Sequence, residues 1–188
     1  MPLAAQDVPN QGPFGFKYGM TKEQVVQLVG NQAVQDFKED VLTLTTAPKP
    51  YAAFEAYSLV ISPDKGVLKI VAVGKTIGTN GFGSELHDAF NEIRGAVTTT
   101  YGKPETYDYL KSGSIWGEPQ EWMMGLLKKE RTLVAYWTVK DTKPNHITYI
   151  ALEAAALSTE AGWLRLGYEF EGFSEYLGAK KAKAQKVF

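Results

Sequence analysis

Residues 74–76, Gly-Lys-Thr, are of the types that hold phosphate groups in nucleotide-binding loops. Such a loop has the pattern Gly-x-x-x-x-Gly-Lys-Ser/Thr between a strand and a helix, because its first glycine lets the backbone fold back over the phosphates. That glycine would stand at position 69, which is Lys69, and the flanking letters VLKIVAVGKTI are typical of a strand. The stretch therefore predicts no nucleotide site, and no cofactor is expected.

Three further glycines follow at positions 78, 81 and 83, directly before a predicted helix. Their spacing is G-x-x-G-x-G rather than the G-x-G-x-x-G of dinucleotide sites. Ser84 is the expected N-cap of the helix, where free backbone N–H groups can hold an anion. The interpretation that we favour is a flexible connector between two structural units.

The remaining candidates for catalysis are two histidines, a serine and two glutamates. His87 is expected on the polar side of a helix and His146 after a hairpin turn, without metal-ligand spacing between them. Ser84 and His87 have the spacing of a helix cap. Glu118 and Glu121 lie near an expected helix start, where the helix dipole favours carboxylates, so glycosidase chemistry is not needed to explain them. We therefore predict no catalytic or metal site, and a protein that is not an enzyme.

An aromatic segment over residues 107–127, YDYLKSGSIWGEPQEWMMGLL, is the stronger candidate for function. Tyrosine, tryptophan and adaptable methionine are prominent at the hot spots of protein interfaces. The alternative is that Trp122 and the apolar residues after it only cover a sheet, which would still leave Trp116 at the surface of a glycine-flanked loop. The candidate partner-binding residues are Tyr107, Tyr109, Trp116, Glu118 and Trp122.

Composition limits the classes of protein that are compatible with these residues. A chain of 188 residues with 44% hydrophobic and 22% charged residues is typical of a soluble globular protein. It contains no cysteine, which excludes disulfides and thiolate metal sites. The formal net charge of −1 argues against the positive surface that nucleic-acid binding requires, so no nucleic acid is expected as a partner.

The first 20 residues have neither a basic region nor an apolar run of about 7 to 15 residues, so we expect no signal peptide and no membrane span. These features predict a cytoplasmic location. The letters LAAQD near the start leave a periplasmic location open, because they would fit the remnant of an export-signal cleavage site behind an added Met1.

Hydrophobic periodicity predicts alternating helices and strands. Thr21 and Gln24 have the spacing of a capping box, and Gly30 is placed to end the helix that they begin. A Ser-Pro-Asp-Lys-Gly turn joins two strand patterns. The expected helices lie within residues 19–31, 84–101 and 117–131, and the expected strands lie at 41–47, 51–61, 67–77, 105–110, 131–139, 147–157 and 163–170.

Two of the predicted hairpins resemble each other. Residues 54–74 align with residues 133–153, and each hairpin comes after a helix closed by glycine. This pattern predicts two tandem helix-plus-meander units, and the alternative is a chance likeness. The expected divisions are an N-terminal extension at 1–18, a first unit at 19–77, a second, enlarged unit at 78–171 and a lysine-rich tail at 172–188. The tail is expected to be a frayed helix or a contact for an acidic partner.

Two stretches carry a family resemblance. The letters FGFKYGMTKEQVVQLVG resemble the start of the tandem bacterial modules typified by β-lactamase inhibitory protein and by outer-membrane assembly lipoproteins, whose units are a helix followed by antiparallel strands. The letters GSIWGEPQEWMMGLLKKERTLVAYW resemble an uncharacterised bacterial family. The resemblance implies a fold. Neither function transfers directly, because the chain lacks cysteines and the lipoprotein signal.

Together these observations predict an α+β fold in which two tandem helix-plus-meander units form an antiparallel sheet with helices on one side. The leading hypothesis for function is a non-enzymatic inhibitor or immunity-type protein that masks a bacterial toxin or enzyme. An envelope scaffold or assembly factor is the second hypothesis. The third is a small-ligand binder that uses the cleft between the units, which requires an apolar cleft with a few polar groups.

Overall fold

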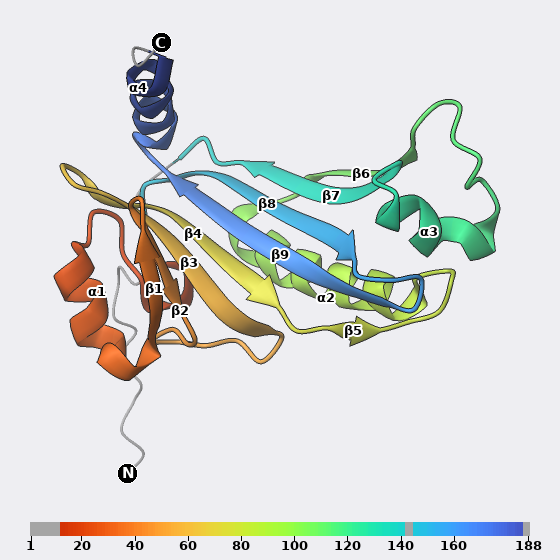
Figure 1. Ribbon diagram of the computed structural model, residues 1–188, viewed down its shortest axis with the longest axis horizontal. Helices are drawn as coiled ribbons and strands as arrows, with labels where there is room; N and C mark the ends of the chain where they lie inside the picture. Colours follow the sequence, from red (N-terminus) through yellow and green to blue (C-terminus); the bar gives the residue numbers. More distant parts are fainter. Residues whose placement is uncertain (1–11, 142–144, 186–188) are drawn as a thin grey trace.

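A single antiparallel sheet organises the computed structural model, which describes residues 12–141 and 145–185. Eight of its nine described strands follow the order β1-β2-β3-β4-β9-β8-β7-β6, and the ninth, the short β5, pairs with β9 (Figure 1). The predicted α+β class is confirmed. The strands are β1 Val34–Lys38, β2 Val41–Leu44, β3 Phe54–Ser62, β4 Gly66–Gly74, β5 Ile77–Gly78, β6 Glu105–Leu110, β7 Arg131–Thr138, β8 Ile147–Ala156 and β9 Ala161–Phe170. The α-helices are α1 Lys22–Val29, α2 Ser84–Tyr101, α3 Trp122–Leu127 and α4 Phe173–Gln185, with 3-10 turns η1 Pro13–Gly15, η2 Asn31–Ala33 and η3 Pro119–Glu121.

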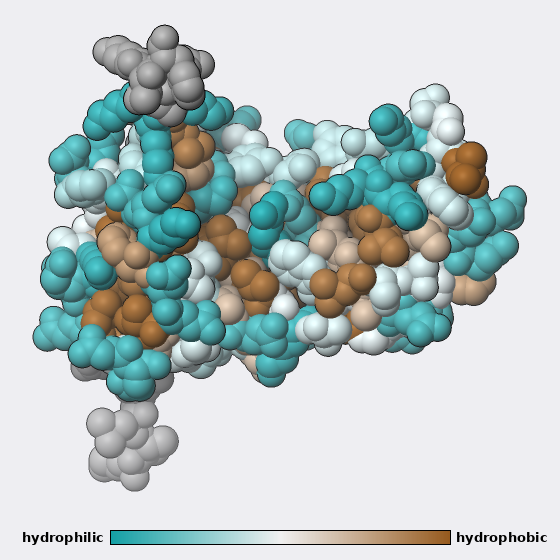
Figure 2. All heavy atoms as spheres, in the orientation of Figure 1, coloured by the Kyte–Doolittle hydropathy of each residue, from teal (hydrophilic) through white to brown (hydrophobic). Residues whose placement is uncertain are grey.

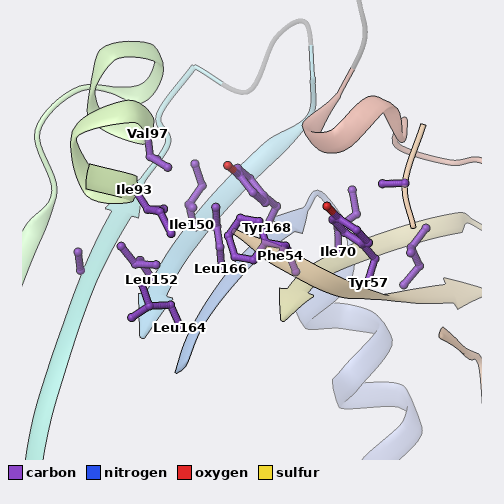
Figure 3. Packing of buried hydrophobic residues seen from close by; sticks show 14 of the residues in the cluster. Phe54, Tyr57, Ile70, Ile93, Val97, Ile150, Leu152, Leu164, Leu166 and Tyr168 are labelled. Carbon is purple, nitrogen blue, oxygen red and sulfur yellow. The ribbon is translucent and has the colours of Figure 1, made fainter. Parts of the chain in front are cut away.

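One face of the sheet, here called the inner face, carries the hydrophobic core. Successive side chains of a strand point to opposite faces, and the strand registers align Leu59, Ile70 and Tyr168 across β3, β4 and β9. All three are buried, as are Ile150 of β8 and Trp137 of β7 on the same row. Figure 3 shows members of this cluster between the sheet and α2. The core is therefore continuous across the sheet.

Helix α1 begins at the predicted capping box. The Gln24 backbone N–H donates to Thr21 Oγ1 at 3.3 Å, and the Thr21 N–H donates to Gln24 Oε1 at 2.9 Å. Gly30 ends the helix with a φ of 83°, which glycine adopts without the steric cost of a side chain. Val25 is buried in the core, so α1 packs on the inner face.

Helix α2 covers the predicted residues, but Ser84 is not its N-cap. The N-cap is Gly83, in a left-handed conformation, and the Asn80 side chain accepts hydrogen bonds from the backbone N–H groups of Phe82 at 3.0 Å and Ser84 at 3.5 Å. An amide side chain three residues before the N-cap therefore replaces the expected serine cap. The stripe that α2 buries consists of Leu86, Phe90, Ile93 and Val97.

The glycines before α2 occupy packed positions, so the prediction of a flexible connector was wrong. Gly78 belongs to β5, which pairs with β9. The Gly81 carbonyl accepts from the backbone N–H of Met123 at 3.0 Å, and a Cβ on Gly81 would collide with the carbonyl oxygen of Gln120. A Cβ on Gly83 would lie 2.5 Å from the Trp122 ring. Glycine is needed here because the segment lies directly against η3 and α3.

The helix expected over residues 117–131 is shorter than predicted. Its start is the 3-10 turn η3, closed by a reciprocal cap between Glu118 and Glu121, and α3 ends at Leu127. The Glu130 carbonyl accepts from the backbone N–H of Lys111 at 2.7 Å, which extends the β6–β7 ladder. Pairing with β6 therefore takes the last residues of the predicted helix into the sheet.

The two halves of the sheet share an order of elements. In each half a helix is followed by antiparallel strands, α1 by β1 to β4 and α2 by β6 to β9, and β4 pairs with β9 at the centre (Figure 1). The hairpin alignment made from sequence matches β3 and β4 with β7 and β8, whereas the order of connection places β3 and β4 opposite β8 and β9. That alignment does not follow the strand order, and the tandem repeat stays a prediction.

Helix α4 leaves the end of β9 and packs beside the turns of the first half (Figure 1). The Tyr176 hydroxyl donates to Asp40 Oδ2 at 2.7 Å, and Lys180 Nζ donates to the Glu39 carbonyl at 3.0 Å. The lysine-rich tail is thus helical over its described part and is held against the β1–β2 turn.

Candidate functional site

The face of the sheet opposite the core, here called the outer face, is not covered by α1, α2 or α3. Buried residues of all three helices belong to the core cluster on the inner face. Figure 2 views the outer face and shows hydrophobic side chains along its middle, over β4 and β9, between hydrophilic margins. By strand register the outer face carries Lys69, Val71 and Val73 of β4; Trp163, Arg165 and Glu169 of β9; Tyr149, Ala151 and Glu153 of β8; Val134 and Tyr136 of β7; and Glu105, Tyr107 and Tyr109 of β6.

Four tyrosines of three neighbouring strands gather on the outer face and form what we call the tyrosine cluster: Tyr107, Tyr109, Tyr136 and Tyr149. The Tyr136 and Tyr149 rings stack with centroids 5.6 Å apart, and Tyr107 lies 6.2 Å from Tyr136. Tyr107 is 45% exposed and Tyr109 55% exposed. The cluster therefore offers aromatic surface to solvent at the β6 edge while its inner members hold one another in place.

The hydroxyl groups of Tyr107, Tyr136 and Tyr149 stay protonated well above neutral pH. Desolvation by burial raises the pKa of Tyr149 to about 12 and also raises the pKa of Tyr136. A hydrogen bond from its hydroxyl to Glu105 Oε2, 2.9 Å long, raises the pKa of Tyr107. At neutral pH these three tyrosines present hydrogen-bond donors and apolar ring faces, without negative charge of their own.

The charged side chains on the middle of the outer face are paired with each other. Lys69 Nζ lies 2.7 Å from Glu169 Oε1, and Arg165 forms an ion pair with Glu153. Lys69 also lies over the ring of Phe173, with its nitrogen 4.8 Å from the ring centroid. Because these charges neutralise one another, the middle of the outer face carries little net charge from these four side chains.

Of the residues that the sequence singled out, Tyr107 and Tyr109 lie together on the outer face. Both belong to β6, the edge strand of the second half, and they flank Asp108, which points to the inner face. Tyr136, Tyr149 and Trp163 also lie on the outer face and were missed by the sequence analysis. Their positions alternate with core residues of the predicted meander, so strand periodicity carried the information to find them.

Trp116 and Glu118 lie apart from the tyrosine cluster, in the loop that leads to α3. Trp116 is half-buried and packs beside Gly125 of α3, whereas its neighbour Ile115 is 77% exposed. Glu118 is exposed and takes part in the cap of η3. The apolar side chain that this loop exposes to solvent is therefore Ile115 rather than Trp116.

Trp122 is buried and is not available to a partner in this structure. Its Nε1 donates to Asp108 Oδ2 at 3.2 Å, and Arg131 Nη1 donates to Asp108 Oδ1 at 3.0 Å. The His87 ring lies 4.2 Å from the Trp122 ring, and His87 Nε2 lies 4.0 Å from Asp108 Oδ2. The carboxylate of Asp108 thus connects α2, β6, α3 and β7. Trp122 packs against the sheet, as in the alternative to a partner-binding role.

The hydroxyl and imidazole groups that were considered for catalysis are engaged in separate contacts. Ser84 Oγ hydrogen-bonds the Asn80 side chain at 3.3 Å, and His87 lies against Trp122. His146 Nδ1 lies 2.8 Å from Glu171 Oε2, and its ring stacks on Tyr18. Each contact has a structural role, in helix capping or packing.

Two further features bear on the candidate site. Within residues 12–141 and 145–185, no group of three or more His, Cys, Asp or Glu side chains is arranged to hold a metal ion. None of the helices in that part of the chain combines the length and the apolar character needed to cross a membrane.

Comparison with known proteins adds no relative: no family model, curated protein or solved structure matches this chain.

Proposed function

We propose that this protein is a non-enzymatic protein-binding module that uses its outer face to mask a bacterial toxin or enzyme, as an inhibitor or immunity-type protein does. The observation that carries the proposal is the tyrosine cluster, an exposed aromatic surface on a sheet face that α1, α2 and α3 leave uncovered. The resemblance of the N-terminal stretch to β-lactamase inhibitory protein modules also motivates this proposal.

Physical chemistry favours tyrosine for this role. A tyrosine side chain contributes a large rigid contact area with few rotatable bonds, so little conformational entropy is lost when a partner orders it. Tyr136 and Tyr149 already stack, and they lie on the same face as the more exposed Tyr107 and Tyr109. A stable protein interface needs about 800 Å² on each partner, an area that several adjacent strands can supply.

The partner that fits this surface is a folded protein rather than a nucleic acid. Arg165 and Lys69, the two basic side chains named on the outer face, are both paired with glutamates. A phosphate backbone would need unpaired cations along its path. A protein with an apolar, hydrogen-bonding patch would meet the tyrosine rings and hydroxyls directly.

The decisive experiment compares three immobilised forms of the protein as baits in bacterial lysate. They are the wild type, the double variant Tyr107→Ala/Tyr109→Ala and the control Leu28→Ala, whose side chain is also exposed, at 50%, but lies on α1. We expect one stoichiometric partner on the wild type and the control. Its affinity for the double variant should be at least about 10-fold weaker, because aromatic hot spots dominate binding.

Masking is then tested on the captured partner. Addition of the wild-type protein should abolish the activity or toxicity of that partner, whereas the same concentration of the double variant should leave most of it intact. A partner that is captured equally by all three forms would reject the outer face as the site. A partner that keeps its activity in the complex would instead favour the alternative hypothesis, an envelope scaffold or assembly factor.

A further inference from the structure

A cleft of about 350 Å³ opens on the inner side of the sheet, where the two halves meet. Its walls are mainly apolar and come from both halves: Phe14 and Phe54 on one side, Ile93 and Val97 of α2 on the other, with Leu166 of β9 at the base. A volume of this size falls in the range of small-molecule sites, roughly 300 to 1,000 Å³. The cleft is separate from the outer face, because it lies on the opposite side of the sheet.

Aromatic rings form much of this cleft. Phe14 meets Phe54 edge-on with ring centroids 5.5 Å apart and meets Tyr168 edge-on at 6.0 Å. Tyr51, at 41% exposure, also lines the opening. Edge-to-face contacts of this kind are the arrangement in which aromatic rings attract each other, so the cleft suits an aromatic guest.

Tyr168 places a hydroxyl group inside the cleft. The residue is 7% exposed, and its side chain rises from β9 with the oxygen directed away from the sheet, between α2 and Phe54 (Figure 3). The hydroxyl donates no hydrogen bond to any residue within the described ranges. Burial raises the pKa of Tyr168, which keeps this donor protonated at neutral pH.

Tyr168 differs from the nearby Tyr57 and Tyr101, whose hydroxyl groups form hydrogen bonds within the protein. The Tyr57 hydroxyl accepts from the backbone N–H of Tyr51 at 3.2 Å, and Tyr101 hydrogen-bonds the Asn145 side chain. Both are satisfied within the protein. The Tyr168 hydroxyl is not among the buried, unpartnered polar atoms of the described residues, so it is accessible from the cleft. An acceptor atom of a ligand can therefore take the hydrogen bond that water would otherwise accept.

Lys49 supplies a positive charge at the opening. It lines the cleft, is exposed, and forms no ion pair with the described residues. Among the described residues that line the cleft there is no aspartate or glutamate, and the nearby Glu92 carboxylate accepts a hydrogen bond from the lining Tyr51 at 3.1 Å. The cleft therefore combines aromatic walls, a hydroxyl donor at depth and a cation at the rim.

We propose that this cleft is a binding site for a small aromatic oxo acid. The aromatic ring packs among Phe14, Phe54 and α2, the keto oxygen accepts from the Tyr168 hydroxyl, and the carboxylate lies near Lys49. This function is independent of protein binding at the outer face, because no residue of the tyrosine cluster lines the cleft.

Three matched probes separate the contributions: benzoylpropionate, which has ring, ketone and carboxylate; phenylbutyrate, which lacks the ketone; and butyrophenone, which lacks the carboxylate. Isothermal titration of the full chain should show saturable binding that is tightest for benzoylpropionate. Tyr168→Phe should lower the affinity for benzoylpropionate by about 2- to 12-fold, which is the range for the loss of one hydrogen bond. The affinity for phenylbutyrate should not change. Lys49→Gln should weaken both acids by up to about 5-fold and leave butyrophenone unchanged.

A steric variant tests the location without touching the core. Ala96 lines the cleft from an exposed position of α2, so Ala96→Trp should fold normally and abolish binding of all three probes. The double variant Tyr107→Ala/Tyr109→Ala should bind benzoylpropionate as the wild type does. The proposal is overturned if benzoylpropionate fails to bind, if Ala96→Trp binds it unchanged, or if Tyr168→Phe weakens both acids equally. If Lys49→Gln bound both acids as tightly as the wild type does, Lys49 would be rejected as the partner of the carboxylate.

Discussion

At the scale of single residues, Asp108 connects its strand to side chains of three other elements, α2, α3 and β7. It accepts hydrogen bonds from Trp122 Nε1 and Arg131 Nη1, and it lies near His87. Arg131 depends on this contact, because its Nε is buried without a hydrogen-bond partner among the described residues. One side chain of the edge strand thus fixes the placement of α3 on the sheet.

The variant Asp108→Asn tests this role. It keeps an oxygen that can accept from Trp122 but removes the negative charge that faces Arg131, and hydrogen bonds to charged groups contribute more than neutral ones. We expect the free energy of unfolding in urea to fall by about 1 to 2 kcal/mol. The control is Glu55→Gln at an exposed position of β3 that has no side-chain hydrogen bond or ion pair to the described residues, expected within about 0.5 kcal/mol of wild type. Equal stability of the two variants would contradict the proposed role of Asp108.

Tyr149 gives a pH dependence whose sign follows from burial. Its pKa is raised from 10.0 to about 12, so the folded protein holds this proton more tightly than the unfolded chain does. The resulting stabilisation is complete below about pH 10 and is lost as the pH rises toward about 12.

Urea unfolding at a series of alkaline pH values, with tyrosinate absorbance as the titration signal, should show this decline in the wild type. In Tyr149→Phe the decline should be smaller, because one of the raised pKa values is gone. An identical decline in both proteins would show that Tyr149 ionises at its usual pKa when folded.

At the scale of elements, the entrance to α2 depends on glycine for two reasons. Gly83 has a φ of 72°, and a Cβ there would meet the Trp122 ring. Both the backbone conformation and the close packing exclude a side chain at this point. The start of α2 and the position of α3 are therefore coupled through one residue.

We accordingly expect Gly83→Ala to lower the free energy of unfolding by about 1 to 3 kcal/mol, measured by urea denaturation. Gly78→Ala is the matched control, because a Cβ at Gly78 meets no atom within 4 Å and its φ is not positive. If Gly78→Ala lowered the free energy of unfolding as much as Gly83→Ala does, the requirement for glycine at position 83 would be contradicted.

At the scale of the whole molecule, the β4–β9 pairing joins the two halves into one sheet over a continuous core. The cleft proposed for an oxo acid also lies at this junction and draws residues from both halves. A structure in which neither half has a separate core should unfold as a single cooperative unit.

Tryptophan fluorescence can test this, because the four tryptophans, Trp116, Trp122, Trp137 and Trp163, all lie in the second half of the chain. Circular dichroism in the far ultraviolet reports both halves. The urea midpoints from the two signals should coincide. A fluorescence transition displaced from the circular dichroism transition would mean that the second half unfolds independently.

Local patterns in the sequence were sufficient for much of the secondary structure. The capping box at Thr21 and Gln24, the buried stripe of α2 and the meander of β7 to β9 depend on neighbours in the chain, so they were predictable. Strand β1 was missed because its burial does not alternate, and β5 because it has two residues. Tyr107 and Tyr109 were predicted as partner-binding residues because they are tyrosines in a segment rich in aromatic residues.

Tertiary structure alone decided which of these residues can act together. Register across β6, β7 and β8 brought Tyr136 between Tyr107 and Tyr149, and packing of α3 on the sheet buried Trp122. The cleft joins residues as distant as Phe14 and Tyr168. Periodicity specifies which side of an element a residue occupies, but the meeting of two elements depends on long-range pairing and packing, which no local pattern encodes.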